Sequence, residues 1–285
     1  MSSLAHDAWR RLRRNRMAIV CTAITAFVIV ACYVGPVIAR VLGLDGITID
    51  TRLGARPPSA AHWFGTDTLG RDMLVRVMIG GRIALVVAAV TTVIALVIGV
   101  TYGAVAAFTG GKTDNVMMRA VDALYGFPTL VFIIVVMAVT GSHSLVVLFA
   151  LIGGISWLTM ARIVRSQVLG LKTREFVDAA RALGASPARV LFRHVLPNAS
   201  GPVIVYATLA LPQVMLTEAF LSFLGLGVQA PLASWGTLVT EGSSQIVVYP
   251  WLLVFPGAVM AVTVMSLNFL GDGLRDALDP QTRKD

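Results

Sequence analysis

The chain has 285 residues, of which 56% are hydrophobic and only 13% are charged. A soluble domain of this size needs more charged residues to cover its surface, so the composition excludes an ordinary soluble protein. The net charge of +8 could indicate nucleic acid or another anionic partner. Membrane insertion requires basic residues on one side, and this explains the charge without a nucleic-acid partner.

Uncharged runs divide the chain into segments long enough to cross a membrane. They cover residues 17 to 39, 83 to 111, 123 to 161, 194 to 217 and 242 to 271. A helix needs about 20 apolar residues to span lipid, which cannot satisfy backbone polar groups. The run from 123 to 161 is long enough for two helices, separated at residues 141 to 144. We therefore predict an all-α membrane protein with six transmembrane helices, near 17–38, 83–108, 123–140, 145–165, 202–224 and 251–270. The third is short and contains Pro128.

The segments follow in chain order. Residues 1–16 form a basic cytoplasmic segment, and 17–42 contain a first helix that is too long for a cleaved signal peptide. Residues 43–82 form an external loop. The five-helix core spans 83–270 and includes a cytoplasmic segment at 171–200 and an external loop within 225–250. Residues 271–285 are a cytoplasmic tail.

The distribution of basic residues predicts which side each segment faces. With the N-terminus inside, 17 of the 23 Lys and Arg fall at cytoplasmic positions, and the loop 225–250 has none. The six external ones begin at Arg40, and several aspartates accompany them in the loop that follows. The positive-inside rule therefore favours cytoplasmic N- and C-termini.

The cytoplasmic segment at 171–200 predicts two short helices. Phe176, Ala179, Ala180 and Leu183 recur at i, i+3, i+4 and i+7, which makes one apolar stripe. Gly184 can end the first helix in the left-handed conformation. Ser186 and Pro187 supply an N-cap and a first helical residue for the second helix. Such a projection either contacts a soluble partner or lies on the lipid surface, and the spacing leaves both open.

Acidic residues within the predicted spans are candidate functional groups. Glu218 lies well inside a span, and Asp122 lies at the cytoplasmic edge of another. Each should face protein or a water-filled path, because an ion in lipid is costly. Glu218 is therefore a candidate for the translocation path, with a structural hydrogen bond as the alternative. For Asp122 we favour the structural bond.

A glycine-rich sequence at residues 110 to 113 resembles the end of a phosphate-binding loop. Ala106 stands where the first glycine should be, and a transmembrane helix precedes the loop in place of a strand. We expect no nucleotide, cofactor or metal to be bound by this chain.

Several motifs resemble one transporter family. Asp178-Ala179-Ala180, Gly184 and Leu196-Pro197 resemble the EAA loop of ABC importer permeases, with aspartate in place of the usual glutamate. Phe64 to Asp72 (FGTDTLGRD), Glu218 to Gly227 (EAFLSFLGLG), Ser234 to Gly236 (SWG) and Gly271 to Pro280 (GDGLRDALDP) look like segments of dipeptide and oligopeptide permeases of the DppC/OppC type. These motifs lie in the expected order along nearly the whole chain.

The resemblance implies a type I ABC importer permease fold in the plasma membrane of a bacterium or archaeon, surrounded by lipid. Its implied partners are a second homologous permease, two cytoplasmic ATPase subunits that hold ATP and Mg, and an extracytoplasmic substrate-binding protein. This chain would then not be an enzyme. The implied coupling residues are Glu175, Phe176, Asp178, Ala179, Ala180, Arg181, Leu183, Gly184, Leu196 and Pro197. Docking candidates on the external side are His62, Phe64, Gly65, Asp67, Arg71, Asp72 and Trp235. A loop that only caps the second helix is the alternative for this external segment.

Two other functions stay open at the level of sequence. The same scaffold could import nickel, glutathione, an antimicrobial peptide or another small solute. An ion-coupled secondary transporter could use Glu218 as a proton carrier, but it predicts internal repeats and broken helices near the midplane. The two halves of the chain show no convincing repeat, and this alternative leaves the segment from Asp178 to Pro197 unexplained.

Overall fold

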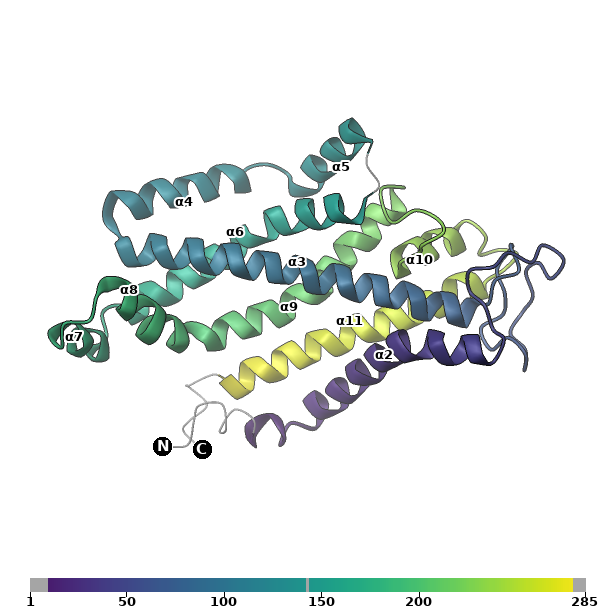
Figure 1. The fold of residues 1–285 in the computed structure, drawn as a ribbon, viewed down its shortest axis with the longest axis horizontal. Coiled ribbons are helices and arrows are strands. Elements are labelled where there is room, and N and C mark those ends of the chain that lie inside the picture. The colour runs from purple at the N-terminus through teal and green to yellow at the C-terminus, as the bar shows by residue number, and fades with distance from the viewer. Residues whose placement is uncertain (1–9, 142–143, 279–285) are drawn as a thin grey trace.

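The computed structural model describes residues 10–141 and 144–278, and in that part of the chain the regular structure is helical (Figure 1). Three parts of the chain lie outside the described residues: residues 1–9, residues 279–285, and Ser142 and His143 in the predicted break. The helices are α2 Arg16–Val41, α3 Met73–Thr109, α4 Gly111–Tyr125, α5 Thr129–Thr140, α6 Leu145–Leu171, α7 Glu175–Ala182, α8 Pro187–Val190, α9 Leu196–Phe223, α10 Trp235–Ser243 and α11 Trp251–Leu278.

The long helices run alongside one another, α4 and α5 lie along one side of them, and the other short elements lie toward the two ends of the bundle (Figure 1). The segment from 42 to 72, which we name the external cap, lies at one end together with α10. Helices α7 and α8 lie at the other end. The start of α2 is near the end of α11, because Gly273 packs against Ala18. Both described ends of the chain are therefore on the side of α7, which we call the cytoplasmic end from the charge distribution.

The longest helix, α3, joins the two ends. Its 37 residues correspond to about 55 Å at 1.5 Å per residue. It begins at Met73, where the Asp72 side chain accepts a hydrogen bond from the backbone N–H of Val75 at 3.0 Å. The helix thus begins ten residues before residue 83, where the sequence predicted its start. The N-cap Asp72 marks the start of the helix. The hydropathy did not show this start, because Arg76 and Arg82 interrupt the apolar residues of the first turns.

The contact between α3 and α6 is close because it uses glycine. Gly103 lies directly against the backbone carbonyl of Ala161, and Gly99 lies against Met160. No side chain beyond hydrogen fits at Gly103, so the two backbones approach as in small-residue packing of membrane helices. The pair forms a stable block in the centre of the bundle.

The third predicted span is not one straight helix. In the described residues, five helices are long and apolar enough to cross a membrane, and α4 with α5 makes a sixth if that pair is one span bent by 72°. The bend falls at residues 126 to 128. Pro128 begins α5 with an extended backbone and cannot continue α4, since its ring removes a donor and clashes with the preceding turn.

Two other boundaries differ from the prediction. The fifth span was expected at 202–224, but α9 begins at Leu196 and follows a π-helical turn, Leu191–Val195, so it is nearly continuous with α8. The expected external loop at 225–250 contains α10. Its N-cap Ser234 exchanges hydrogen bonds with Thr237 in a capping box, a signal that the glycines and Pro231 hid.

Candidate functional site

The cytoplasmic projection begins with α7, which ends in a glycine motif. Gly184 has φ +79°, its N–H donates to the carbonyl of Arg181, and the N–H of Ala185 donates to the carbonyl of Ala180. These two bonds satisfy the last carbonyls of α7 and define a Schellman motif. Ser186 then caps α8 through a bond from the N–H of Arg189. The predicted helix, left-handed glycine and second helix are all present.

The apolar residues of α7 lie on two faces. Val177 is fully buried and Ala180 is 7% exposed, and both pack in a cluster that includes Val190 of α8 and Ala104 and Ala107 of α3. Phe176, Ala179 and Leu183 point outward, and Leu183 is 89% exposed. The predicted single stripe is therefore corrected at Ala180, which packs inside this chain. Val177, which the i, i+4 count omitted, belongs with it.

The charges of the projection are accessible. Glu175 and Asp178 lie in the first turn of α7, where they complement the helix dipole. Asp178 contacts Arg181 at 3.4 Å, with both side chains at least half exposed, so their mutual attraction is weak. Pro197 is exposed and Leu196 half-buried at the start of α9. An exposed leucine next to accessible charges of both signs is a surface suited to a soluble partner.

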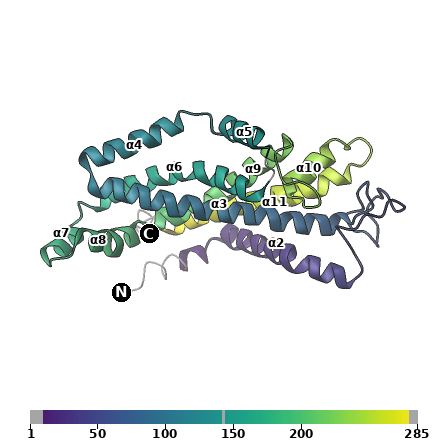
Figure 2. The same cartoon turned by 45° about the horizontal axis from the view of Figure 1, so that its top comes forward.

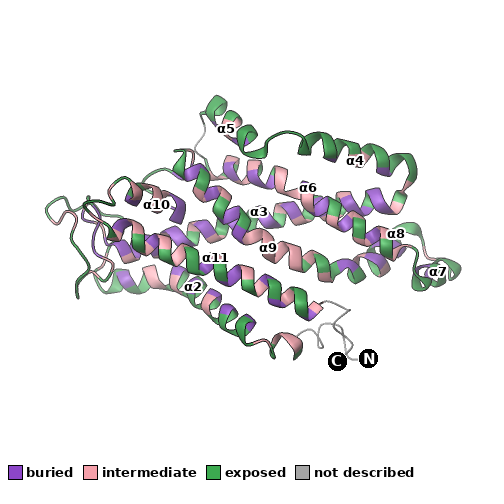
Figure 3. Ribbon diagram, turned by 180° about the vertical axis from the view of Figure 1, so that it is seen from behind, coloured by how far each residue is buried: buried purple, intermediate pink, exposed green. Residues whose placement is uncertain are grey.

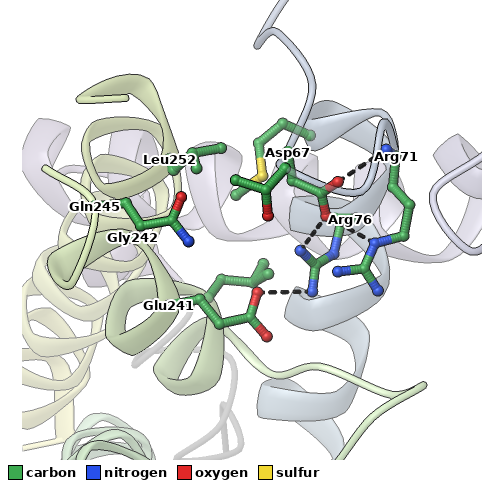
Figure 4. Close-up of a pocket in the computed structure, with 10 residues that line it drawn as sticks. Asp67, Arg71, Arg76, Glu241, Gly242, Gln245 and Leu252 are labelled. Atoms are coloured by element: carbon green, nitrogen blue, oxygen red, sulfur yellow. Dashed lines mark hydrogen bonds and ion pairs between the residues drawn. The ribbon is translucent and has the colours of Figure 1, made fainter. Parts of the chain in front are cut away.

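Several charged residues of the external cap pair within the chain. Asp67 is 4% exposed and accepts bonds from the guanidinium groups of Arg71 at 2.7 Å and Arg76 at 2.6 Å, and Arg76 also reaches Glu241 of α10 at 2.9 Å (Figure 4). His62 contacts Asp72 at 2.8 Å, and Asp72 is also buried. These ionic groups tie the cap to α3 and α10.

The remaining docking candidates also pack within the chain. Phe64 stacks on Phe255 of α11 at 4.2 Å between ring centroids, and Gly65 is buried with φ +75°. Trp235 is fully buried, and its indole N–H donates to the carbonyl of Val77 at 2.8 Å. The geometry thus favours the capping alternative for these side chains, and Trp235 is not an exposed docking group.

Other cap residues remain at the surface. Asp45 accepts bonds from the Thr48 hydroxyl and the Ile47 N–H, and these bonds hold the pKa of its carboxyl below the usual value. Trp63 is 69% exposed. The predicted docking residues are thus buried or half-buried in this chain, and other cap residues supply the exposed surface at this end.

Glu218, the candidate for the translocation path, is enclosed. It is 1% exposed, and the hydroxyls of Ser222 and Ser234 donate to one of its oxygens at 2.8 and 2.6 Å. Ser234 is the N-cap of α10, so Glu218 joins α9 to α10. These contacts favour the structural interpretation for this residue. It also applies to Asp122, whose partner is Arg162 of α6 at 2.7 Å.

Sequence reasoning missed the bridging role of Arg76 and Glu241. Arg76 is 5% exposed at the external end of α3, and a buried arginine requires carboxylate partners. Nothing in the sequence placed Glu241 beside it, because the expected loop at 225–250 had no predicted helix to orient that side chain.

The fold defines a class of protein. It is an all-helical membrane protein in which a short helix pair projects from the cytoplasmic end between two long helices. The protein matches a chain of a structure titled "Inward facing conformations of the MetNI methionine ABC transporter" with a TM-score of 0.57, covering 73% of this chain and 96% of that one. At 19% identity this likeness shows the ABC importer permease fold alone.

Comparison with known sequences gives the family. Residues 99–284 match the model of the binding-protein-dependent transport system inner membrane component, and residues 3–44 match the N-terminal TM domain of oligopeptide transport permease C. The oligopeptide transport system permease protein OppC of Bacillus subtilis is 44% identical over 99% of this chain and 91% of its own length. OppC of Escherichia coli is 44% identical over 99% and 92%, and the dipeptide transport system permease protein DppC of Bacillus subtilis is 43% identical over 99% and 87%.

This chain therefore belongs to the family of binding-protein-dependent transport permeases, in the branch that includes OppC and DppC. It is a multi-pass inner-membrane component and not an enzyme. Family membership decides against the ion-coupled secondary transporter, although the bent α4–α5 pair is a feature that this alternative also predicted.

Proposed function

We propose that this chain is a transmembrane permease of an ATP-driven importer of di- or oligopeptides, and that it forms the translocation path with a second, homologous permease. Identity of 43 to 44% to both OppC and DppC along nearly the whole chain carries this proposal. Two cytoplasmic ATPase subunits would bind ATP and Mg, and an extracytoplasmic binding protein would deliver the peptide.

We name residues 175–190, which form α7, α8 and the turn between them, the coupling segment. This segment would connect the ATPase subunits to the transmembrane helices. An ATPase surface would receive Leu183 and Phe176, and its basic groups would pair with Asp178 and Glu175. When ATP closes the ATPase dimer, α7 would move with its ATPase and the attached helices would rearrange between inward- and outward-facing states. Such coupling requires that the ATPase contacts differ in free energy between the two states.

A transport assay tests the substrate. The permease would be expressed with the partner permease, ATPases and binding protein of its own operon, in a bacterial strain that lacks peptide uptake. We expect ATP-dependent accumulation of labelled di- and tripeptides. Accumulation of nickel or glutathione without peptide would refute the peptide assignment and leave the permease assignment intact. Uptake by the permease without its ATPases would refute the coupling mechanism.

A further inference from the structure

Helix α4 is attached to α6 by a series of polar side-chain pairs. Asp114 accepts two bonds from Arg165, at 2.6 and 2.7 Å, and Asp122 accepts one from Arg162 at 2.7 Å. One turn further along α4, the hydroxyl of Tyr125 hydrogen-bonds to that of Thr159. The partners advance along α4 as they recede along α6, which is the order for antiparallel neighbours (Figure 2). We name these three pairs the α4–α6 ladder.

Apolar packing contributes little to the position of α4. Within this helix, which the structure describes in full, the buried residues are Asp114 and Val121. Val116 is 67% exposed and Leu124 is 50% exposed, and most of the outer surface of α4 is accessible (Figure 3). Arg162 also lies over the Tyr125 ring at 4.0 Å, a cation–π contact. The ladder, rather than a broad buried apolar face, therefore supplies the contacts between α4 and α6, while Tyr102 of α3 donates to the carbonyl of Met117 in α4 at 2.9 Å.

The α6 side of the ladder belongs to the same packed block as the coupling helix. Val164 and Val168, next to the ladder arginines, lie in one cluster with Val177 and Ala180 of α7. Lys172, at the end of α6, donates to the carbonyl of Ala107 in α3 at 2.7 Å. Residues beside the ladder arginines thus share one packed cluster with α7.

Non-helical joints bound α4 at both ends. Gly110, between α3 and α4, and Gly111, the first residue of α4, have φ of +70° and +58°, and the chain bends by 72° between α4 and α5. An element with two joints and little apolar burial can change its position unless directional contacts fix it. The guanidinium fork of Arg165 gives such direction, because bidentate pairing with a carboxylate sets both distance and orientation.

We propose that Arg162 and Arg165 are positioning residues that make α4 follow α7, so that movement of the coupling segment reaches α5 through α4. The proposal rests on the proposed function, since it assumes that an ATPase moves α7. Its tests separate the two.

A distance measurement tests whether α4 follows α7. Spin labels at exposed Val116 and Leu183 would report the distance between α4 and α7 in the assembled transporter, without nucleotide and with trapped ATP. We expect the same distance in both states for the otherwise unaltered chain. In the double variant Arg162→Gln, Arg165→Gln it should change by about 5 Å or more between the states. A change of that size in the unaltered chain, or none in the variant, would overturn the proposal.

A transport measurement distinguishes positioning from simple structural support. Arg162→Gln should lower the peptide imported per ATP hydrolysed by about three- to tenfold, while the amount of assembled complex stays unchanged. Exchanging the charges, Asp122→Arg with Arg162→Asp, should recover most of this ratio. Arg119→Gln, an exposed change on the same helix, is the matched control.

Loss of assembled complex with an unchanged ratio would show that the ladder only stabilises the fold, and the proposal would be wrong. If the unaltered complex imports no peptide, the proposed function fails, and the distance measurement still decides whether α4 follows α7.

Discussion

At the scale of single residues, Leu183 is the sharpest probe of the coupling surface. It is 89% exposed and touches little of its own chain, so Leu183→Ser should leave folding and membrane insertion intact. Burying a leucine side chain in a partner contributes about 1.5 to 3 kcal/mol. The variant should therefore weaken ATPase association at least tenfold, measured as binding of the purified ATPase to the permease in nanodiscs. Unchanged affinity would mean that α7 rests on the lipid surface.

A substitution at Gly184 tests the turn between α7 and α8, whereas Leu183 tests the contact with the ATPase. With φ of +79°, a β-branched residue at this position costs about 1 to 2 kcal/mol, because its Cβ crowds the carbonyl oxygen. Gly184→Val should redirect α8 and reduce substrate-stimulated ATP hydrolysis by the assembled complex. Gly154→Val is a control, since that helical glycine has no neighbour within 4 Å. Equal effects of the two changes would contradict the role of the turn.

Ala180 shows what a pattern can miss at this scale. The i, i+3, i+4, i+7 spacing grouped it with the outward residues, yet it faces Val190 and α3. A short helix with apolar residues on adjacent positions has more than one possible inner face, and the packing of the neighbouring helices selects it. Ala180→Trp would thus disturb the internal packing of the projection and is not a clean test of ATPase contact.

At the scale of elements, the external cap depends on Asp67. This carboxylate accepts bonds from the backbone N–H groups of Leu69 and Arg71 as well as from two arginines. Asp67→Asn removes one charge of a buried network and leaves Arg76 with Glu241 alone, at a cost of about 3 kcal/mol. The cap should become sensitive to external protease while α3 remains inserted. Asp45→Asn, at an exposed position, should have no such effect, and resistance of the Asp67 variant would argue against the network.

The elements differ in how far the sequence determines them. The long uncharged runs predicted the helices α2, α3, α6, α9 and α11, but misplaced some of the residues at which these helices begin or end. Hydropathy marks where charged residues stop, not where a helix begins. The third span was misjudged because Pro128 acts through backbone geometry, which hydropathy does not measure. Helix α10 was missed for a similar reason, since Trp235, Leu238 and Gly242 are buried by tertiary contacts of a segment that looks like a loop.

The candidate site was predictable where it is local in sequence and unpredictable where it is not. The helix, left-handed glycine and N-cap at 175 to 187 follow from neighbouring residues. Ser234, one partner of Glu218, is 16 residues away, and Glu241, one partner of Arg76, lies in a different helix, and a single sequence does not encode such pairs visibly.

At the scale of the whole molecule, the orientation in the membrane can be tested with exposed positions. Leu183 directly follows α7 and Val247 lies between α10 and α11, so single cysteines at these positions, which are 89% and 93% exposed, would stand at opposite ends of the bundle (Figure 1). An impermeant thiol reagent should label the first from the cytoplasm and the second from outside, in a background with Cys21 and Cys32 replaced. Trp235, being fully buried, is unsuitable for this assay. The reversed pattern would overturn the assigned sidedness.

The length of α3 has a consequence for how the two faces of the membrane communicate. The same unbroken helix carries the cap at its first residue and the block beneath α7 at its last turns. A rigid rod of about 55 Å that tilts by about five degrees about its centre moves its two ends by roughly 2.4 Å in opposite directions. A helix that tilted in this way would act as a lever, so a partner bound at its outer end would oppose or assist a force applied at its inner end.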